Sequence, residues 1–178
     1  KAKELYKQLL KEYPNNELAA YELARILMVQ NQPEEAIIWA NKAAALNPSN
    51  VWYAILKADA MQAMGQYKDA AGVYEQLTRQ FPTQSNYFYK WAFYLVKANE
   101  LNPALRVYDD LERRIGMNET LVRLKHGLYH AQGDDKKAAR ELQRLADAHP
   151  NNIDYKHNLA EFYTEIGDKE QARATYRK

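Results

Sequence analysis

Alanine recurs every 34 residues along the whole sequence, at Ala2, Ala36, Ala70, Ala104, Ala138 and Ala172. The phrase around the third of these alanines, G-x-Y-x-x-A-x-x-x-Y, begins at Gly65 and ends at Tyr74, and variants of it surround the others. Self-similarity at a fixed period of about 20 to 50 residues is typical of proteins that stack one structural unit. The sequence therefore predicts a repeat architecture.

Turn-forming residues recur in the same frame. One column tolerates a left-handed backbone, as the end of a helix requires: Asn31, Gly65, Asn99, Gly133 and Gly167. A second column is mostly proline, which stops a preceding helix: Pro14, Pro48, Pro82, Gly116 and Pro150. A third column is mostly asparagine, which caps a following helix: Asn16, Asn50, Gln84, Asn118 and Asn152. Each period is predicted to be a helix, a turn, a second helix and a turn.

Composition favours an all-α chain, because Gly and Pro number only 6 each and most lie at the predicted turns. The predicted helices are 1–13, 17–30, 33–46, 51–64, 67–80, 85–98, 101–115, 119–132, 135–148, 153–166 and 169–178. We call the first helix of each pair A and the second B. The expected organisation is a single solenoid, 1–178, with a partial repeat 1–16, repeats 17–50, 51–84, 85–118 and 119–152, and a partial repeat 153–178.

Several classes of protein are disfavoured by composition. The chain has no Cys, which excludes a disulfide framework, a thiol nucleophile and Cys-ligated zinc. Lys and Arg total 25 against 23 for Asp and Glu, so charge does not favour nucleic acid as a partner. No window approaches the length of an apolar membrane span. The chain starts without Met and both ends fall inside repeats, so we expect a piece of a longer array.

The columns resemble those of the tetratricopeptide repeat (TPR), whose 34-residue unit has a small residue in helix A, Gly at the turn, Ala and an aromatic residue in helix B, and Pro at the end. The resemblance covers the whole chain. The fourth repeat departs most, with Lys125 and His126 in place of leucine and a small residue, and Gly116, just before it, replaces proline. The resemblance implies a right-handed superhelix of antiparallel helix pairs with a concave groove lined by A helices. It also implies binding of peptides or proteins and no catalysis.

Carried onto this sequence, the family's groove positions predict a partner-binding set. Its members are Tyr21, Arg25, Met28, Trp52, Ile55, Asp59, Asn86, Tyr89, Phe93, Lys97, Arg123, His130 and His157. The N-terminal part of this set is apolar and aromatic, whereas the C-terminal part is polar and mixed in charge. Exposed aromatic side chains anchor the apolar side chains of partners, although packing within the chain itself is the competing interpretation. Lys97, Arg123, His130 and His157 predict a basic zone for an acidic segment, which Asp154, Glu161 and Glu165 weaken at the far end.

No catalytic, cofactor-binding or metal-binding site is predicted. His126 and His130 lie four residues apart on one helix, with His157 as the one candidate for a third zinc ligand, and packing is the favoured role for His126. The two serines, Ser49 and Ser85, lie at turns and outside any nucleophile motif. No glycine-rich phosphate loop is present. The chain is therefore not expected to be an enzyme.

Two functional interpretations follow. The first is a non-catalytic scaffold that binds a peptide or protein partner of unknown identity in its groove, with no nucleic acid and no membrane span. The alternative is a structural spacer of a longer array, which contacts its own chain or self-associates through its ends. The residues favour neither the cytoplasm nor the bacterial envelope.

Overall fold

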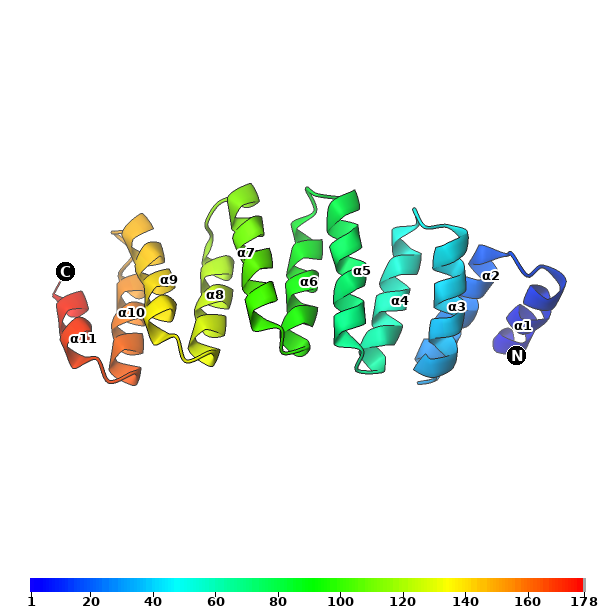
Figure 1. Cartoon of the computed structure of the whole chain (residues 1–178), viewed down its shortest axis with the longest axis horizontal. Helices are drawn as coiled ribbons and strands as arrows, with labels where there is room; N and C mark the ends of the chain where they lie inside the picture. Colours follow the sequence, from blue (N-terminus) through cyan, green and yellow to red (C-terminus); the bar gives the residue numbers. More distant parts are fainter. Residues whose placement is uncertain (178) are drawn as a thin grey trace. The chain divides into compact units, whose positions relative to one another are not determined.

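A computed structural model describes residues 1–177, and the regular structure in this range is entirely α-helical. The chain divides into two compact units, Lys1–Glu100 and Leu101–Lys178, which are described separately below. Within each unit, consecutive helices run antiparallel and are joined by short turns (Figure 1).

The first unit contains α1 (Ala2–Glu12), α2 (Glu17–Val29), α3 (Pro33–Leu46), α4 (Val51–Ala63), α5 (Tyr67–Gln80) and α6 (Ser85–Lys97). The second unit contains α7 (Leu101–Ile115), α8 (Glu119–Ala131), α9 (Asp135–Ala148), α10 (Ile153–Glu165) and α11 (Lys169–Tyr176). Every observed bound lies within two residues of the predicted one. The last residue of the final predicted helix, 178, lies outside the described residues. The all-α repeat fold predicted from the sequence is confirmed.

The turns from A helices to B helices have the backbone geometry that their residues predict. All five members of the left-handed column have positive φ, including the two asparagines, Asn31 at 55° and Asn99 at 60°. The next residue then donates its N–H to a carbonyl five positions back, as Gln66 does to Met61 at 2.9 Å. This bond satisfies a carbonyl that the end of the helix leaves unpaired. The repeated phrase thus encodes a helix stop.

The asparagine column provides N-caps. Asn16, Asn50, Asn118 and Asn152 each accept a hydrogen bond on the side-chain oxygen from a backbone N–H in the first turn of the helix that follows. Gln84, the one member of the column with a longer side chain, makes no such bond at the start of α6.

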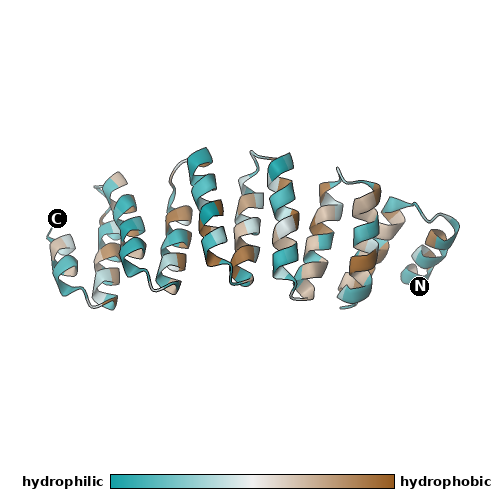
Figure 2. Ribbon diagram, viewed as in Figure 1, coloured by the Kyte–Doolittle hydropathy of each residue, from teal (hydrophilic) through white to brown (hydrophobic). Residues whose placement is uncertain are grey.

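The alanine series marks buried positions early in the B helices. Ala36, Ala70, Ala104 and Ala138 are fully buried. In the first unit a core cluster around Leu23, Leu27 and Tyr53 joins α1, α2, α3 and α4. In the second, a cluster that includes Val122, Leu142 and Phe162 joins α8, α9 and α10. Figure 2 shows hydrophilic and hydrophobic residues alternating along the helices, with hydrophilic residues over most of α9.

Neighbouring repeats are also joined by hydrogen bonds that recur in the same frame. The Tyr53 hydroxyl donates to Glu17 at 3.5 Å in the first unit, and the Tyr155 hydroxyl donates to Glu119 at 2.8 Å in the second. In both cases the first residue of one A helix meets the third residue of the next. No helix in the described part of the chain is both long and apolar enough to span a membrane.

Candidate partner-binding faces

The first unit carries ten of the predicted partner-binding residues on its three A helices. Their spacing of three, four or seven residues on each helix places them on one side of it. We call this set the first A face: Tyr21, Arg25 and Met28 on α2; Trp52, Ile55 and Asp59 on α4; Asn86, Tyr89, Phe93 and Lys97 on α6.

Two large apolar side chains of the first A face are open to solvent. Trp52 is 67% exposed and Phe93 is 42% exposed. Ile55 and Tyr89 are half-buried. Met28 is also half-buried, and it packs against the core clusters of the first unit. Much of its side chain is therefore not available to a partner.

On α2, a short chain of contacts holds the exposed cation in place. The Tyr21 ring packs on the Tyr53 ring, with centroids 4.9 Å apart. The Arg25 guanidinium lies 5.8 Å from the centre of the Tyr21 ring. It also donates to both carboxylate oxygens of Glu22, each at 3.0 Å. The charge of Arg25 is therefore already balanced by a neighbour on the same helix.

On α6, the exposed Phe93 lies between a cation and a buried ring. The Lys97 ammonium lies 5.6 Å from the centre of the Phe93 ring. The edge of the adjacent Tyr94 ring contacts it, with centroids 5.2 Å apart. Tyr94 is buried, and its hydroxyl donates to Gln62 on α4 at 2.5 Å. This bond links two of the helices that carry the first A face.

Asp59 is the acidic member of the first A face. Its side chain is exposed, and no cation of the described residues lies within 4.0 Å of its carboxylate. Desolvation by the surrounding protein raises the pKa of Asp59, and the charge of Lys90 opposes this shift. The Asp59 charge in turn adds to the burial that raises the pKa values of Tyr74 and Tyr94. The carboxylate thus lies near enough to Tyr74, Tyr94 and Lys90 for its charge to be felt, but it has no cation at ion-pair distance among the described residues.

The second unit carries the remaining predicted residues, and each of them is paired with a carboxylate. Arg123 Nε donates to Glu119 at 2.7 Å. His130 Nδ1 lies 2.7 Å from Asp135, and His157 Nε2 lies 3.1 Å from Glu161. The predicted basic residues of this unit therefore have acidic neighbours within bonding distance.

The histidine pair of α8 has a packing environment. His126 Nδ1 lies 3.1 Å from the carbonyl oxygen of Ala138 on α9. The edges of the His126 and His130 rings meet Phe162, with centroids 4.6 and 5.4 Å apart. Among residues 1–177, no group of three or more His, Cys, Asp or Glu side chains is placed to hold a metal ion. His126 thus fills the small-residue position by packing on Phe162 and α9.

An unpredicted charged cluster lies among α7, α8 and α9. Lys125 is only 4% exposed, and its ammonium lies 2.7 Å from Asp109, 2.8 Å from Glu112 and 3.3 Å from Glu141. Arg144 bridges Glu112 and Glu141. Burial alone would raise the pKa of Glu112, but hydrogen bonds from Arg144 and Lys125 hold it below its usual value. Likewise, bonds to Asp109 and Glu112 outweigh burial and raise the pKa of Lys125.

We call these five residues the Lys125 cluster. The sequence indicated only that Lys125 departs from the expected leucine. The signal that would have revealed its partners is a set of acidic residues on the two neighbouring B helices, with Asp109 and Glu112 one turn apart on one and Glu141 on the next.

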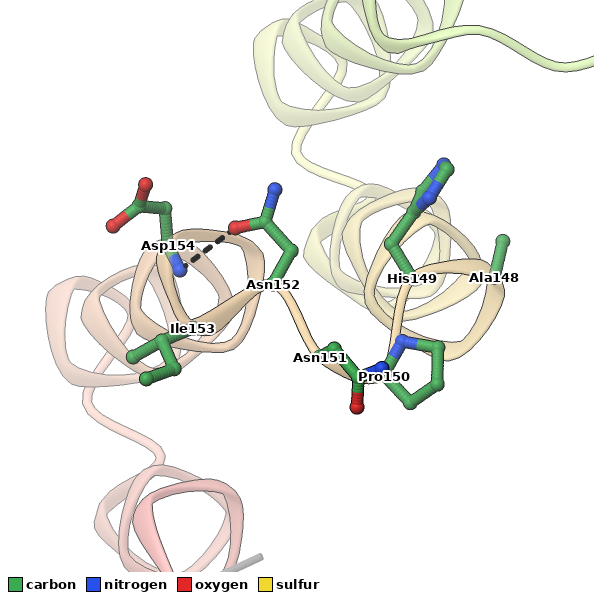
Figure 3. A pocket seen from close by; sticks show the side chains of 7 residues that line it. All are labelled: Ala148, His149, Pro150, Asn151, Asn152, Ile153 and Asp154. Carbon is green, nitrogen blue, oxygen red and sulfur yellow. Dashed lines mark hydrogen bonds between the residues drawn. The ribbon is translucent and has the colours of Figure 1, made fainter.

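A hollow of about 730 Å³ lies elsewhere in the second unit (Figure 3). It is a wide, open depression over the turn between α9 and α10, from Ala148 to Asp154. The Asn152 side chain that lines it accepts a hydrogen bond from the Asp154 N–H, as the N-cap of α10. The depression therefore follows from how this turn is built.

Paired antiparallel helices in a fixed frame, with A helices that present varied side chains, define a helical repeat solenoid. Three tetratricopeptide repeat family models match the chain, over residues 1–51, 122–152 and 153–178. The chain is a tetratricopeptide repeat protein. A further family model, that of subunit 3 of the anaphase-promoting complex (cyclosome), matches residues 29–111. No curated protein sequence matches the chain.

Solved structures share the fold at low sequence identity. The Naa15/Naa10 complex bound to HypK-THB is 15% identical over 97% of this chain and 27% of its own, with a TM-score of 0.78. A tetratricopeptide repeat protein from Parabacteroides merdae is 18% identical over 97% of this chain and 69% of its own, with a TM-score of 0.64.

YrrB, described as a TPR protein with an unusual peptide-binding site, is 18% identical over 96% of this chain and 88% of its own, with a TM-score of 0.59. The fold of this chain is thus one that generally serves as a scaffold for protein–protein interactions and is generally non-catalytic.

Proposed function

We propose that this protein is a non-catalytic interaction module and that the first A face binds a segment of a peptide or protein partner. The observation that carries the proposal is the solvent exposure of Trp52 and Phe93 on this face. Covering large apolar side chains with a partner is favourable, because each Å² of apolar surface removed from water contributes about 25 cal/mol to the free energy of binding.

The same repeat positions in the second unit differ in character, which supports assigning the apolar anchor to the first. Thr120 occupies the place of Trp52, and Gly127 occupies the place of Phe93. The described contacts give the second unit paired charges at its remaining predicted positions. A partner's apolar side chains would therefore find their anchors on α4 and α6.

Selection from a random 12-residue peptide library displayed on phage tests this proposal. The wild-type chain should enrich peptides rich in large apolar residues. The double variant Trp52→Ala/Phe93→Ala should fold, because both side chains are exposed, and it should lose that enrichment. Helix content by circular dichroism checks folding.

The matched control changes the corresponding part of the second unit. Thr120→Ala/Arg123→Ala should select the same peptides as the wild type, since Arg123 is already paired with Glu119. Equal enrichment by the wild type and Trp52→Ala/Phe93→Ala would overturn the assignment of the first A face. Self-association that is seen in light scattering and persists in this double variant would instead support the spacer interpretation, in which the ends of the chain make the contact.

A further inference from the structure

The charges on the first A face are unequally satisfied. Arg25 is balanced by both carboxylate oxygens of Glu22, and Lys97 lies over the Phe93 ring. Asp59 is the exception, since no cation of the described residues lies within 4.0 Å of it. An ionised group without a partner near apolar surface gains more from an incoming opposite charge than a paired group does.

The position of Asp59 adds aromatic surface to this charge. Ile55 lies one helical turn before Asp59, and Trp52 lies two turns before it on the same side of α4. Phe93 holds the corresponding repeat position on α6, which is tied to α4 by the bond from Tyr94 to Gln62. A carboxylate beside exposed rings suits a lysine or arginine, which can pair with the carboxylate while its alkyl stem or charge rests on the rings.

The surroundings of Asp59 strengthen an ion pair formed there. The protein around the carboxylate desolvates it, which raises the pKa of Asp59. Because that environment screens charge less than bulk water does, an incoming cation interacts with Asp59 more strongly than with a fully solvated carboxylate.

The neighbouring lysines limit how many cations the face accepts. Lys90 lies close enough for its charge to act on Asp59, and Lys97 lies over Phe93. A run of basic residues would bring like charges against both lysines, which disfavours binding. The complementary segment therefore has a single cation.

We propose that the first A face recognises a peptide segment with one lysine or arginine next to a large apolar side chain, and that Asp59 pairs with that cation. This inference rests on the proposed partner-binding function of the same face. The apolar side chain anchors the segment against Trp52 or Phe93, and the cation sets which segments are chosen.

The same 12-residue phage library tests the inference with a second pair of variants. Wild-type chain should enrich peptides with one Lys or Arg within two residues of Trp, Phe or Leu. Asp59→Asn keeps the side-chain size and removes the charge, so it should retain the apolar enrichment and lose the basic one. Asp69→Asn, an equal charge change on an exposed residue of α5, should select the same peptides as the wild type.

A synthetic copy of the best wild-type peptide then gives the magnitude by fluorescence anisotropy. Replacing its basic residue by Gln should weaken binding to the wild-type chain about tenfold. The same replacement should change binding to Asp59→Asn less than about twofold if Asp59 is the partner of that residue.

The outcomes separate this inference from the function on which it rests. Apolar peptides enriched without a basic preference, or with an acidic one, would overturn the role of Asp59 and leave the partner face standing. Absence of any enrichment by the wild-type chain would overturn both.

Discussion

Lys125 occupies a repeat position that holds fully buried leucines elsewhere, at Leu23 and Leu159. Burying an ammonium group is unfavourable unless carboxylates compensate it, and the Lys125 cluster provides three. Lys125 thereby links α7, α8 and α9 through ion pairs, whereas the leucines at the same position of other repeats pack by apolar contact.

Lys125→Met should strongly destabilise the chain. The substitution keeps an unbranched side chain but leaves Glu112 and Glu141 without their buried cation, at a cost of about 2 kcal/mol in the free energy of unfolding. Urea denaturation at pH 7 measures this. The matched control is Lys57→Met at the same repeat position two repeats earlier, where Lys57 is half-buried and unpaired among the described residues; its effect should stay within about 0.5 kcal/mol.

The loss in Lys125→Met should also depend on pH. The folded-state pKa of Glu112 lies below its usual value of 4.5, so the stability that Glu112 contributes is present above pH 4.5 and is lost as the pH falls through the folded-state pKa. The difference between the wild type and Lys125→Met should therefore shrink in acid. A difference independent of pH would indicate that lost packing, not lost charge pairing, destabilises the variant.

Residue identity predicted some of these features and not others. The frame identified Lys125 and His126 as departures, and it placed Trp52 and Phe93 on A helices. It did not reveal that Asp59 lacks a partner or that Arg25 pairs with Glu22, because side-chain conformers decide these contacts. Met28 is half-buried, whereas Gln62, at the same position of the next repeat, is exposed. The repeat position of a residue therefore does not by itself predict its exposure.

Helix boundaries depend on short local signals, and this is why the sequence predicted them so closely. The five left-handed residues end the A helices, and the asparagine column begins the next ones. Each signal acts within about one turn of helix, so distant packing does not override it.

Asn118→Ala should destabilise the second unit by about 1 kcal/mol, because it removes the side-chain oxygen that caps α8. This oxygen accepts a bond from the Leu121 N–H at 3.0 Å. Gln84→Ala, in the same column of the frame, is the control and should have little effect, since Gln84 caps nothing. Urea midpoints compare the two variants. Equal losses would show that the column acts through some property other than capping.

The whole chain is predicted to be one solenoid, although it divides into two compact units after Glu100. We propose that residues 1–178 unfold together, because the 34-residue period continues across this division. The repeat 85–118 contributes α6 to the first unit and α7 to the second. Solenoids transmit stability from one repeat to the next through such nearest-neighbour units.

The tryptophans make this proposal testable, since Trp39, Trp52 and Trp91 all lie in the first unit. Lys125→Met destabilises the second unit, so its effect on tryptophan fluorescence reports coupling. A cooperative chain should show the same lowered urea midpoint by fluorescence and by circular dichroism. An unchanged fluorescence midpoint together with a two-step loss of helix would show that the units unfold independently.

The hydrogen bonds from Tyr53 to Glu17 and from Tyr155 to Glu119 connect residues only 36 positions apart. Each joins the start of one A helix to the start of the next, so the interaction is completed as soon as the following repeat has been made. A chain with contacts of such short sequence separation can fold progressively from the ribosome and rapidly in solution. Because 36 positions exceed the 34-residue period, a single repeat cannot carry both partners: the repeats that begin with Glu17 and Glu119 hold Ala19 and Leu121 where the tyrosine would be needed. Lengthening the array in evolution while keeping this bond therefore requires two successive repeats to be duplicated together.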